Sequence, residues 1–232
     1  MSSARKESTI IVAGGKGLRA GGDLPKQFRL IGEMPMLMHT ILAFHRYNPQ
    51  MKIVLVLPDG FQSLWNELCR LHDFNVSHKV VMGGETRFHS VKNGLVEIAE
   101  EEIVGVHDAA RPFVGTDLIA RCFNTSERQD CGVIPVVEEV NSVRLLTENG
   151  SRIIDRQLLR VIQTPQVFPA RQLKKAYEAV FDPVFTDDAS VVEKSGMHIL
   201  MIKGEESNIK ITTPFDWIIA ETLWQNYIKT TK

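Results

Sequence analysis

The chain has 232 residues, of which 44% are hydrophobic and 24% are charged, and its formal net charge is −1. This is the composition of an ordinary soluble protein that can bury a large core. The balanced charge lacks the basic excess that nucleic acid or an anionic membrane surface selects, so we expect neither as a partner.

Cysteine usage and the N-terminus both indicate a cytoplasmic location. Cys69, Cys122 and Cys131 are odd in number and widely spaced, which argues against a disulfide framework and against a zinc site. The first residues, MSSARKEST, lack the apolar core of a signal peptide. No apolar run approaches the roughly 18 residues of a membrane span.

Short apolar runs recur along the chain and are typical of strands buried on both faces of a parallel sheet. In chain order they cover residues 9–13, 52–58, 79–84, 103–108, 131–137 and 198–204. Apolar residues at helical spacing predict helices at 34–47, 59–72, 86–101 and 116–124, the last with Thr116 as its N-cap. The alternation predicts an α/β fold, a mostly parallel sheet flanked by helices, with residues 1–232 in a single domain.

One segment, at about residues 137–159, breaks this alternation and predicts a β-hairpin arm. Its strands alternate on both sides of Asn149-Gly150, a strong hairpin signal because both turn residues take φ > 0. A hairpin this small cannot bury its own apolar side chains. Those expected to stay partly exposed are Val140, Val143, Leu145, Ile153 and Leu158. We therefore expect a second subunit to cover them, in a homodimer.

The stretch IIVAGGKGLRAGGDLPKQF, residues 10–28, places five glycines directly after a predicted strand. Such a turn presents backbone N–H groups to an anion and lets it approach closely. The spacing matches neither G-x-x-x-x-G-K-[ST] nor G-x-G-x-x-G. Arg19 and Lys26 instead suit a reaction in which negative charge develops at phosphorus. The alternative is a flexible surface turn with solvated charges, which the glycine density and the paired cations make less favourable.

The stretch VGVHDAARPFV, residues 104–114, ends another predicted strand. Ligands of open α/β sheets bind at the carboxyl ends of strands. Asp108 and Arg111 would lie at that edge, and Ala109 and Ala110 would leave room for a ligand. The alternative is that Asp108 caps the following turn and Arg111 pairs with a surface carboxylate.

Six motifs together carry a resemblance to a known family. They are AGGKGLRAGGDLPKQF, GGETRFHSV, VHDAARPF, DRQLLRVIQTPQVFP, FTDDASVVE and NIKITTP. In this order, from about residue 9 to residue 225, they resemble the 2-C-methyl-D-erythritol 4-phosphate cytidylyltransferases of the non-mevalonate isoprenoid pathway. The resemblance implies a Rossmann-like nucleotidyltransferase fold and a homodimer joined through a protruding β-arm. It also implies transfer of a cytidylyl group from CTP to the polyol phosphate, with release of pyrophosphate.

The resemblance further implies roles for individual residues. The catalytic cations would be Arg19, Lys26 and Lys210. The CTP-binding positions would be Ala13, Gly14, Gly15, Gly84, Glu85, Ser90 and Ala109. The polyol phosphate would be bound by Asp108, Arg111, Arg156, Thr164 and Thr186, with Arg156 or Thr186 acting across the dimer interface. A divalent cation, Mg²⁺ or another, is expected at Asp108, because Mg²⁺ keeps several waters and needs only one or two carboxylates.

Two positions depart from the family pattern. Ala20 replaces a methionine that commonly follows the loop arginine, and Glu139 stands where a substrate-contacting threonine is common. A carboxylate there would repel a phosphorylated substrate, and Ser142 could substitute if the register slips.

Two alternative functions stay open at the level of sequence. Ribitol 5-phosphate cytidylyltransferases share the glycine-rich loop and PKQF, whereas VHDAARPF and FTDDASVVE favour the methylerythritol enzymes. A non-catalytic nucleotide-binding protein is the other alternative, and the retained cations argue against it. A convincing Ser-His-Asp set is missing from the chain, which suits this chemistry because a phosphate monoester is already mostly dianionic.

Overall fold

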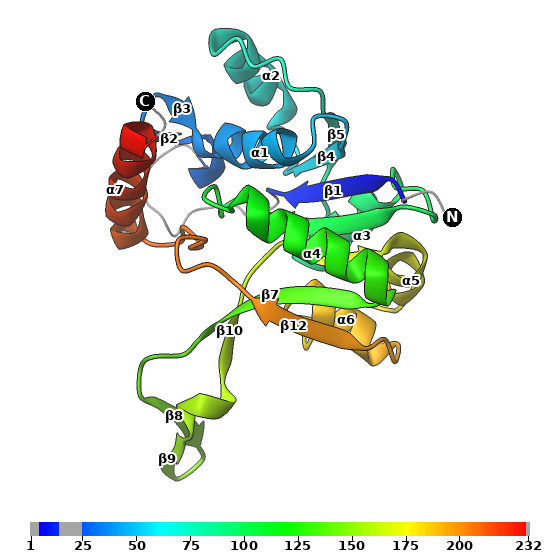
Figure 1. Cartoon of the computed structure of the whole chain (residues 1–232), viewed down its shortest axis with the longest axis vertical. Helices are drawn as coiled ribbons and strands as arrows, with labels where there is room; N and C mark the ends of the chain where they lie inside the picture. The colour runs from blue at the N-terminus through cyan, green and yellow to red at the C-terminus, as the bar shows by residue number, and fades with distance from the viewer. Residues whose placement is uncertain (1–4, 14–24, 231–232) are drawn as a thin grey trace.

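A mixed eight-stranded sheet forms the centre of the molecule (Figure 1). The structure, a computed structural model, describes the backbone of residues 5–13 and 25–230 and the side chains as far as residue 226. The strand order is β10-β7-β11-β6-β1-β4-β5, and β12 also pairs with β7. The strands are β1 (Glu7–Val12), β4 (Lys52–Leu57), β5 (Lys79–Met82), β6 (Ile103–Asp108), β7 (Gly132–Glu138), β10 (Arg160–Ile162), β11 (Gln166–Pro169) and β12 (Ile199–Lys203).

Strand direction explains where a ligand site can form. β1 pairs in parallel with both β4 and β6, and β4 pairs in parallel with β5. The carboxyl ends of these strands therefore meet at one edge of the sheet, which is where open α/β folds bind ligands. The six predicted strands are confirmed. β11 runs antiparallel between β6 and β7, and β10 runs antiparallel beside β7; neither strand was predicted from its short run.

Helices cover both faces of the sheet, as Figure 1 shows. On one face lie α1 (Met36–Tyr47), α2 (Gln62–Leu71) and α4 (Thr116–Gln129); on the other lie α3 (Arg87–Leu95), α5 (Ala170–Ala176) and α6 (Asp188–Lys194). Alternate residues of β1 serve the two layers, because Ile11 packs in the first core while Ile10 and Val12 pack in the second. This two-sided burial is why the strand sequences are apolar throughout.

The chain also crosses one end of the sheet. The short η2 (Lys26–Phe28), β2 (Leu30–Ile31) and β3 (Met34–Pro35) precede α1, and α7 (Pro214–Thr230) follows β12. Buried side chains of α7 pack against this region and against Ala110. None of the described helices combines the length and the hydrophobicity needed to cross a bilayer.

The predicted cap of α4 is wrong by one residue. Thr116 is the first helical residue, and Gly115 is the N-cap without a side-chain hydrogen bond. The N–H of Ile119 donates to the Gly115 carbonyl at 3.1 Å, which is the first hydrogen bond of the helix. The Gly115 N–H is satisfied by the Glu205 carboxylate at 3.1 Å instead.

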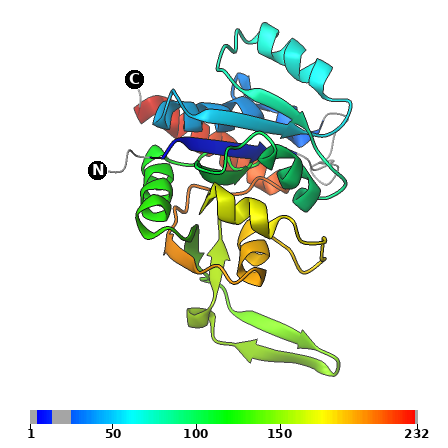
Figure 2. The same ribbon diagram turned by 90° about the vertical axis from the view of Figure 1, so that its right-hand side faces the viewer.

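The predicted arm is present and stands clear of the body in both views (Figures 1 and 2). It consists of β8 (Val143–Thr147), β9 (Gly150–Ile154) and the short η3 (Arg156–Leu158). Its turn differs from the prediction: Thr147 pairs with Gly150, so Glu148 and Asn149 form the two-residue loop. Only Gly150 of the predicted pair has positive φ, at 134°. The strand pairing that starts at Val143 and Ile154 and runs to the tip of the hairpin sets this register. It outweighs the local preference for a turn with Asn149-Gly150 as its two central residues.

The apolar exposure expected of the arm is largely confirmed. Val140, Leu145, Ile153 and Leu158 are exposed, and Val143 is half-buried. Leu146, not predicted, is 82% exposed, and Ile153 is 75% exposed. In the β8–β9 register both side chains lie on the same face of the hairpin.

Candidate functional site

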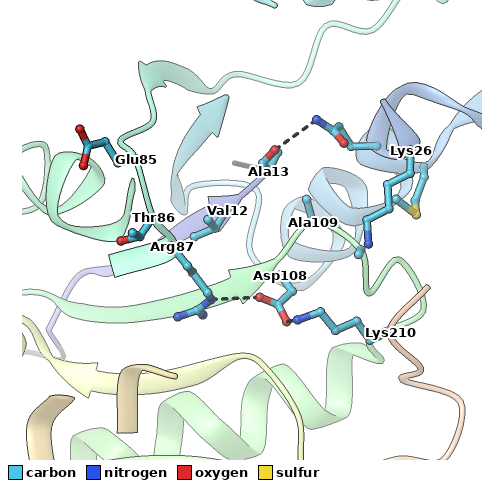
Figure 3. A pocket seen from close by; sticks show the side chains of 12 residues that line it. Val12, Ala13, Lys26, Glu85, Thr86, Arg87, Asp108, Ala109 and Lys210 are labelled. Carbon is cyan, nitrogen blue, oxygen red and sulfur yellow. Dashed lines mark hydrogen bonds and ion pairs between the residues drawn. The ribbon is translucent and has the colours of Figure 1, made fainter. Parts of the chain in front are cut away.

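A cavity of about 190 Å³ opens at the carboxyl ends of β1 and β6, beside the first residues of α3 (Figure 3). Its lining residues are Val12, Ala13, Lys26, Gln27, Met36, Glu85, Thr86, Arg87, Asp108, Ala109, Ala110 and Lys210. Predicted site residues from four separate motifs thus meet at this predicted edge of the sheet.

A second cavity of about 220 Å³ adjoins the first. It is lined by Arg87, Asp108, Arg111, Ile162, Gln163, Thr164, Gln166, Thr186, Asp187 and Lys210. Three of these residues, Arg87, Asp108 and Lys210, line both cavities. The candidate site is therefore a pair of cavities that meet around Asp108.

Asp108 is the last residue of β6, and the backbone around it is tightly held. The Ala109 N–H donates to the Val12 carbonyl at 3.0 Å, which keeps the chain against β1 one residue beyond the strand. The Arg111 N–H then donates to the Asp108 carbonyl at 3.0 Å and closes a turn. This turn directs the Asp108 carboxylate into both cavities.

Three cations surround the Asp108 carboxylate, two of which are drawn in Figure 3. Oδ1 lies 3.3 Å from Arg87 Nε, and Oδ2 lies 2.8 Å from Lys210 Nζ and 3.7 Å from Arg111 Nε. Burial alone would raise the pKa of Asp108, but the charges of Arg87, Lys210 and Arg111 outweigh it and hold that pKa well below its usual value. Asp108 is therefore ionised at neutral pH, and its low proton affinity makes it a poor general base.

A buried hydrogen-bond chain supports Asp108 from behind. Its N–H donates to Thr164 Oγ1 at 3.1 Å, and Thr164 Oγ1 lies 3.1 Å from His107 Nδ1. Burial lowers the pKa of His107 to about 4, so the ring is neutral. The Thr164 hydroxyl then donates to Nδ1, and the His107 Nε2–H donates to the Arg111 carbonyl at 3.0 Å. His107 is structural, and the Thr164 hydroxyl is already engaged.

Arg111 ties a separate segment to the site. Its Nη1 donates to the Asn208 carbonyl at 2.7 Å and its Nη2 to the Ile162 carbonyl at 3.2 Å. The Asn208 amide in turn donates to the Thr164 carbonyl at 2.8 Å. The backbone near residue 208 is thereby fixed, which brings Lys210 within reach of Asp108.

Two lysines reach the first cavity from different segments. Lys26 Nζ donates to the Ile211 carbonyl at 2.8 Å, so the two lysine-bearing segments are joined at the cavity wall. The Lys210 side chain is 44% exposed, which leaves it able to reorient toward a ligand. The other predicted members of the glycine-rich loop, Gly14, Gly15 and Arg19, lie outside the described residues.

The GGET motif contributes a shaped backbone. The Gly84 N–H donates to Ser90 Oγ at 3.1 Å, and Ser90 is buried. A Cβ at Gly84 would lie 2.4 Å from His89 Cβ, so only glycine fits this approach to α3. Glu85 follows at the rim of the cavity. Ser90 therefore acts on the loop backbone and is not a solvated helix serine.

The arm residues lie apart from the cavities. Arg156 belongs to η3, where its Nη1 donates to the Val140 carbonyl at 2.5 Å. It is absent from the described lining of either cavity of its own subunit. Glu139 is exposed at the base of the arm and accepts from the Asn141 N–H at 2.7 Å, also outside that lining. Thr186, in contrast, lines the second cavity.

Arg87 was missed at the level of sequence. It opens α3 and lines both cavities. One signal could have found it: an arginine at the start of a predicted helix opposes the helix dipole, which is unfavourable unless carboxylates from elsewhere in the chain compensate it.

The described residues fit a weakly held divalent cation rather than a dedicated metal cage. No group of three or more His, Cys, Asp or Glu among them is arranged to hold a metal. Asp108 and Glu85 are the carboxylates that line the first cavity. That donor set fits Mg²⁺, which binds through one or two carboxylates together with substrate phosphates and water.

Comparison with known proteins gives consistent relatives. A family model described as 2-C-methyl-D-erythritol 4-phosphate cytidylyltransferase, IspD, matches residues 8–226. The chain is 53% identical to the 2-C-methyl-D-erythritol 4-phosphate cytidylyltransferase of Bacteroides fragilis over 216 residues, covering 93% of this chain and 98% of that one. It is also 53% identical to the Bacteroides thetaiotaomicron protein of the same name over 218 residues, covering 94% and 99%.

The solved structures agree with these sequences. The crystal structure of 4-diphosphocytidyl-2C-methyl-D-erythritol synthase from Anaerococcus prevotii superposes with a TM-score of 0.81 at 26% identity, covering 96% of this chain and 97% of that one. The mixed, mainly parallel sheet between helices is therefore the Rossmann-like nucleotidyltransferase fold that the resemblance implied.

Proposed function

This chain belongs to the 2-C-methyl-D-erythritol 4-phosphate cytidylyltransferase family, and on that premise we propose how its two cavities share the reaction. The chain is a nucleotidyltransferase that transfers the cytidylyl group of CTP to 2-C-methyl-D-erythritol 4-phosphate. The products are 4-diphosphocytidyl-2-C-methyl-D-erythritol and pyrophosphate, a step of non-mevalonate isoprenoid biosynthesis.

The reaction depends more on the positioning of the substrates than on acid–base catalysis. A phosphate oxygen of the polyol phosphate attacks the α-phosphorus of CTP, and a new P–O bond forms. The bond from the α-phosphorus to the bridging oxygen breaks, and its electron pair leaves with pyrophosphate. A phosphate monoester has a second pKa of about 6 and needs no base at neutral pH. The protein must hold two polyanions in line and stabilise the charge that develops.

We assign the first cavity to CTP. Support comes from the loop before α3: Ser90 Oγ holds the Gly84 N–H, and the next residue, Glu85, lines this cavity, so a backbone fixed at this point is suited to distinguish the exocyclic amine of cytosine from the carbonyl of uracil. The remaining nucleotide positions in this assignment are Ala13, Gly14, Gly15, Glu85 and Ala109. Lys26 reaches this cavity, and with Arg19 it supplies positive charge to the triphosphate.

We assign the second cavity to the polyol phosphate. Asp108, Arg111, Thr164 and Thr186 contribute to its wall. The single observation that carries the assignment is that Asp108, Lys210 and Arg87 line both cavities, with Asp108 in contact with each of the two cations. A lysine placed where two phosphorylated substrates meet is suited to stabilising the transferring phosphoryl group.

We assign Mg²⁺, or another divalent cation, to Asp108. When bound, the ion neutralises charge on the triphosphate oxygens. Asp108 is the candidate because it is ionised and lines the nucleotide cavity. Its oxygens contact cations in this structure, so a shift of Lys210 toward substrate would expose Oδ2 to the metal.

We also propose a cytoplasmic homodimer, with each chain folded as one domain. The exposed apolar side chains of the arm support a two-fold interface. Arg156 lies on this arm and outside the described lining of its own cavities, which agrees with a role in the partner's polyol site. Glu139 is exposed at the base of the arm and lies outside the described lining of both cavities. The charge of Glu139 therefore does not face the cavities of its own subunit.

A coupled pyrophosphate-release assay tests the proposal. With CTP and Mg²⁺ present, 2-C-methyl-D-erythritol 4-phosphate should support turnover at least about 10²-fold more efficiently than ribitol 5-phosphate, in kcat/KM. A higher kcat/KM with ribitol 5-phosphate would favour the ribitol alternative. Binding of CTP without turnover on either polyol would favour a non-catalytic nucleotide-binding protein.

A further inference from the structure

Arg87 occupies an unfavourable place for a cation. It is the first residue of α3, after the N-cap Thr86, and the first turn of α3 contains no acidic residue. A positive charge at a helix N-terminus opposes the helix macrodipole. Local rules of this kind are broken most often at functional sites, where another interaction compensates.

Two carboxylates from distant parts of the chain compensate Arg87. Its Nη1 and Nη2 donate to the two oxygens of Asp188 at 3.0 and 2.6 Å, in a bidentate pair. Its Nε lies 3.3 Å from Asp108 Oδ1 (Figure 3). Asp188 is fully buried and also accepts from the Tyr177 hydroxyl at 2.6 Å. The Arg87 side chain keeps 28% of its surface exposed, and this part faces the two cavities it lines.

These contacts connect two separate segments that contribute to the wall of the second cavity. Asp108 ends β6, whereas Asp188 begins α6 directly after Thr186 and Asp187, which line that cavity. Because Arg87 contacts both carboxylates, it sets the distance between the Thr186 wall and Asp108. A lysine could not do this as well, since an ammonium is a point charge and a guanidinium is a planar fork.

The charge balance of the cluster gives Arg87 a second effect. Asp108 and Asp188 are in contact with Arg87, Arg111 and Lys210, so two carboxylates face three cations. Without Arg87 the cluster would be neutral, and Asp108 would hold both remaining cations. With Arg87 present, one positive charge is in excess and Lys210 can turn toward a substrate phosphate.

We propose that Arg87 is a positioning residue of the transfer reaction: it joins Asp108 to Asp188 across the polyol cavity and leaves Lys210 available to substrate phosphate. The inference rests on the proposed assignment of the second cavity to the polyol phosphate. It assigns no bond-making step to Arg87, which acts through Asp108, Asp188 and Lys210.

The test neutralises the buried pair without leaving a lone charge. Arg87→Met combined with Asp188→Asn removes both partners, which costs far less stability than removing one. The matched control is Lys52→Met combined with Glu102→Gln, another pair with a nearly buried carboxylate, 2.7 Å apart and outside both cavities. Thermal midpoints, KM for each substrate and kcat are measured for all forms.

We expect the Arg87/Asp188 double variant to lose about 10²-fold in kcat/KM for the polyol phosphate, the scale of misplacing a reacting group by about 1 Å. KM for CTP should change less than about threefold, and the control should stay within about threefold of wild type throughout. Arg87→Lys alone keeps one charge but cannot bridge both carboxylates, so KM for the polyol phosphate should rise about tenfold in a protein that is less stable but still folded at the assay temperature.

Either of two results would overturn the inference. One is a double variant whose polyol kcat/KM stays within about threefold of wild type. The other is Arg87→Lys with an unchanged KM for the polyol phosphate, a result that also decides the matter if the double variant unfolds. Failure of the wild-type protein to turn over CTP and 2-C-methyl-D-erythritol 4-phosphate would instead count against the proposed function.

Discussion

In the proposed assignment, single side chains at this site either meet substrate or hold the residues that do. Lys26 and Lys210 project into the nucleotide cavity from segments that are joined by the hydrogen bond from Lys26 to the Ile211 carbonyl. His107 and Thr164 belong to the second kind, because their polar atoms are engaged with Asp108 and with the Arg111 carbonyl. The two kinds of residue should respond differently to substitution and to pH.

Lys26→Ala should lower kcat by roughly 10²–10³, the scale for losing one preorganised electrostatic group. The fold should survive, because the lost hydrogen bond to the Ile211 carbonyl contributes only about 1 kcal/mol. Steady-state kinetics and a thermal melt are compared with wild type. A collapse of the melting temperature, with activity following folded fraction, would show that Lys26 is structural.

Acid should destabilise the fold between about pH 6.5 and pH 4 through His107. Burial lowers its folded-state pKa to about 4, from the ordinary histidine value of about 6.5. In that interval the unfolded chain binds a proton that the folded chain does not, so stability falls as pH falls. The loss from this group levels off below about pH 4, at roughly 3 kcal/mol.

Urea denaturation at pH 7.5 and pH 5 measures the effect, and His107→Gln should make the difference between the two pH values smaller. His39 and His78 also have lowered pKa values because of burial, so the same sign of dependence should persist at reduced size. An unchanged pH dependence in His107→Gln would show that His107 is not protonated on unfolding in this range.

At the scale of elements, the start of α3 and the loop before it form one wall of the nucleotide cavity. Gly84 approaches His89 so closely that a Cβ would lie 2.4 Å from His89 Cβ, and its N–H is held by Ser90 Oγ. The position of this loop therefore depends on α3, and its backbone groups keep a fixed orientation. A pocket of fixed donors and acceptors discriminates between bases better than a mobile one.

Gly84→Ala should raise KM for CTP by about tenfold and weaken the preference for CTP over UTP, because the loop must move away from α3. KM for the polyol phosphate should change little, since the adjoining Glu85 lines the first cavity and is absent from the described lining of the second. Gly60→Ala provides a control for glycine substitution itself, because nothing lies within 4 Å of the added Cβ, although φ is 81° there. Equal CTP and UTP discrimination in wild type and Gly84→Ala would remove this loop from base recognition.

At the scale of the whole molecule, the arm is the feature that a monomer does not explain. β8 and β9 pair only with each other in the described structure and stand away from the body (Figure 2). They expose large apolar side chains. Two chains related by a two-fold axis could cover the same surface on each other. The arm would then carry Arg156 toward the neighbouring subunit.

Shortening the arm should yield monomers with impaired polyol binding. Because Val143 pairs with Ile154, residues 144–153 can be replaced by an Asn-Gly turn without disturbing β7 or β10. We expect a rise of about tenfold or more in KM for the polyol phosphate, while KM for CTP stays within about threefold. Leu146→Lys with Ile153→Lys should act in the same direction, and Val96→Lys, exposed on the body, is the control. An unchanged dimer on sedimentation, with unaltered polyol KM, would contradict the proposed interface.

Much of this molecule is readable from local sequence. Four of the six apolar runs, which form β1, β4, β6 and β7, are apolar throughout because both faces of the sheet are buried there, whereas β5 and β12 are only partly covered. Asp108 was predicted to lie at the carboxyl edge of the sheet, close to the glycine-rich segment that contains Lys26, and both residues line the same cavity. The carboxyl ends of adjacent parallel strands lie at the same edge of a sheet, independently of the sequence and conformation of the loops that connect the strands.

Other features were decided only by the tertiary structure. β10 and β11 are too short to show a pattern, and the hairpin turn shifted by one residue because strand pairing outweighed the local turn preference. Arg87 and Asp188 are 101 residues apart in the chain, and the local sequence around either residue does not indicate the other as its partner. Periodicity reports which side of an element is buried, whereas a contact between distant charges depends on the order and direction of the strands that carry them. The joining of the two cavities around Asp108 is therefore a property of the fold and not of any one motif.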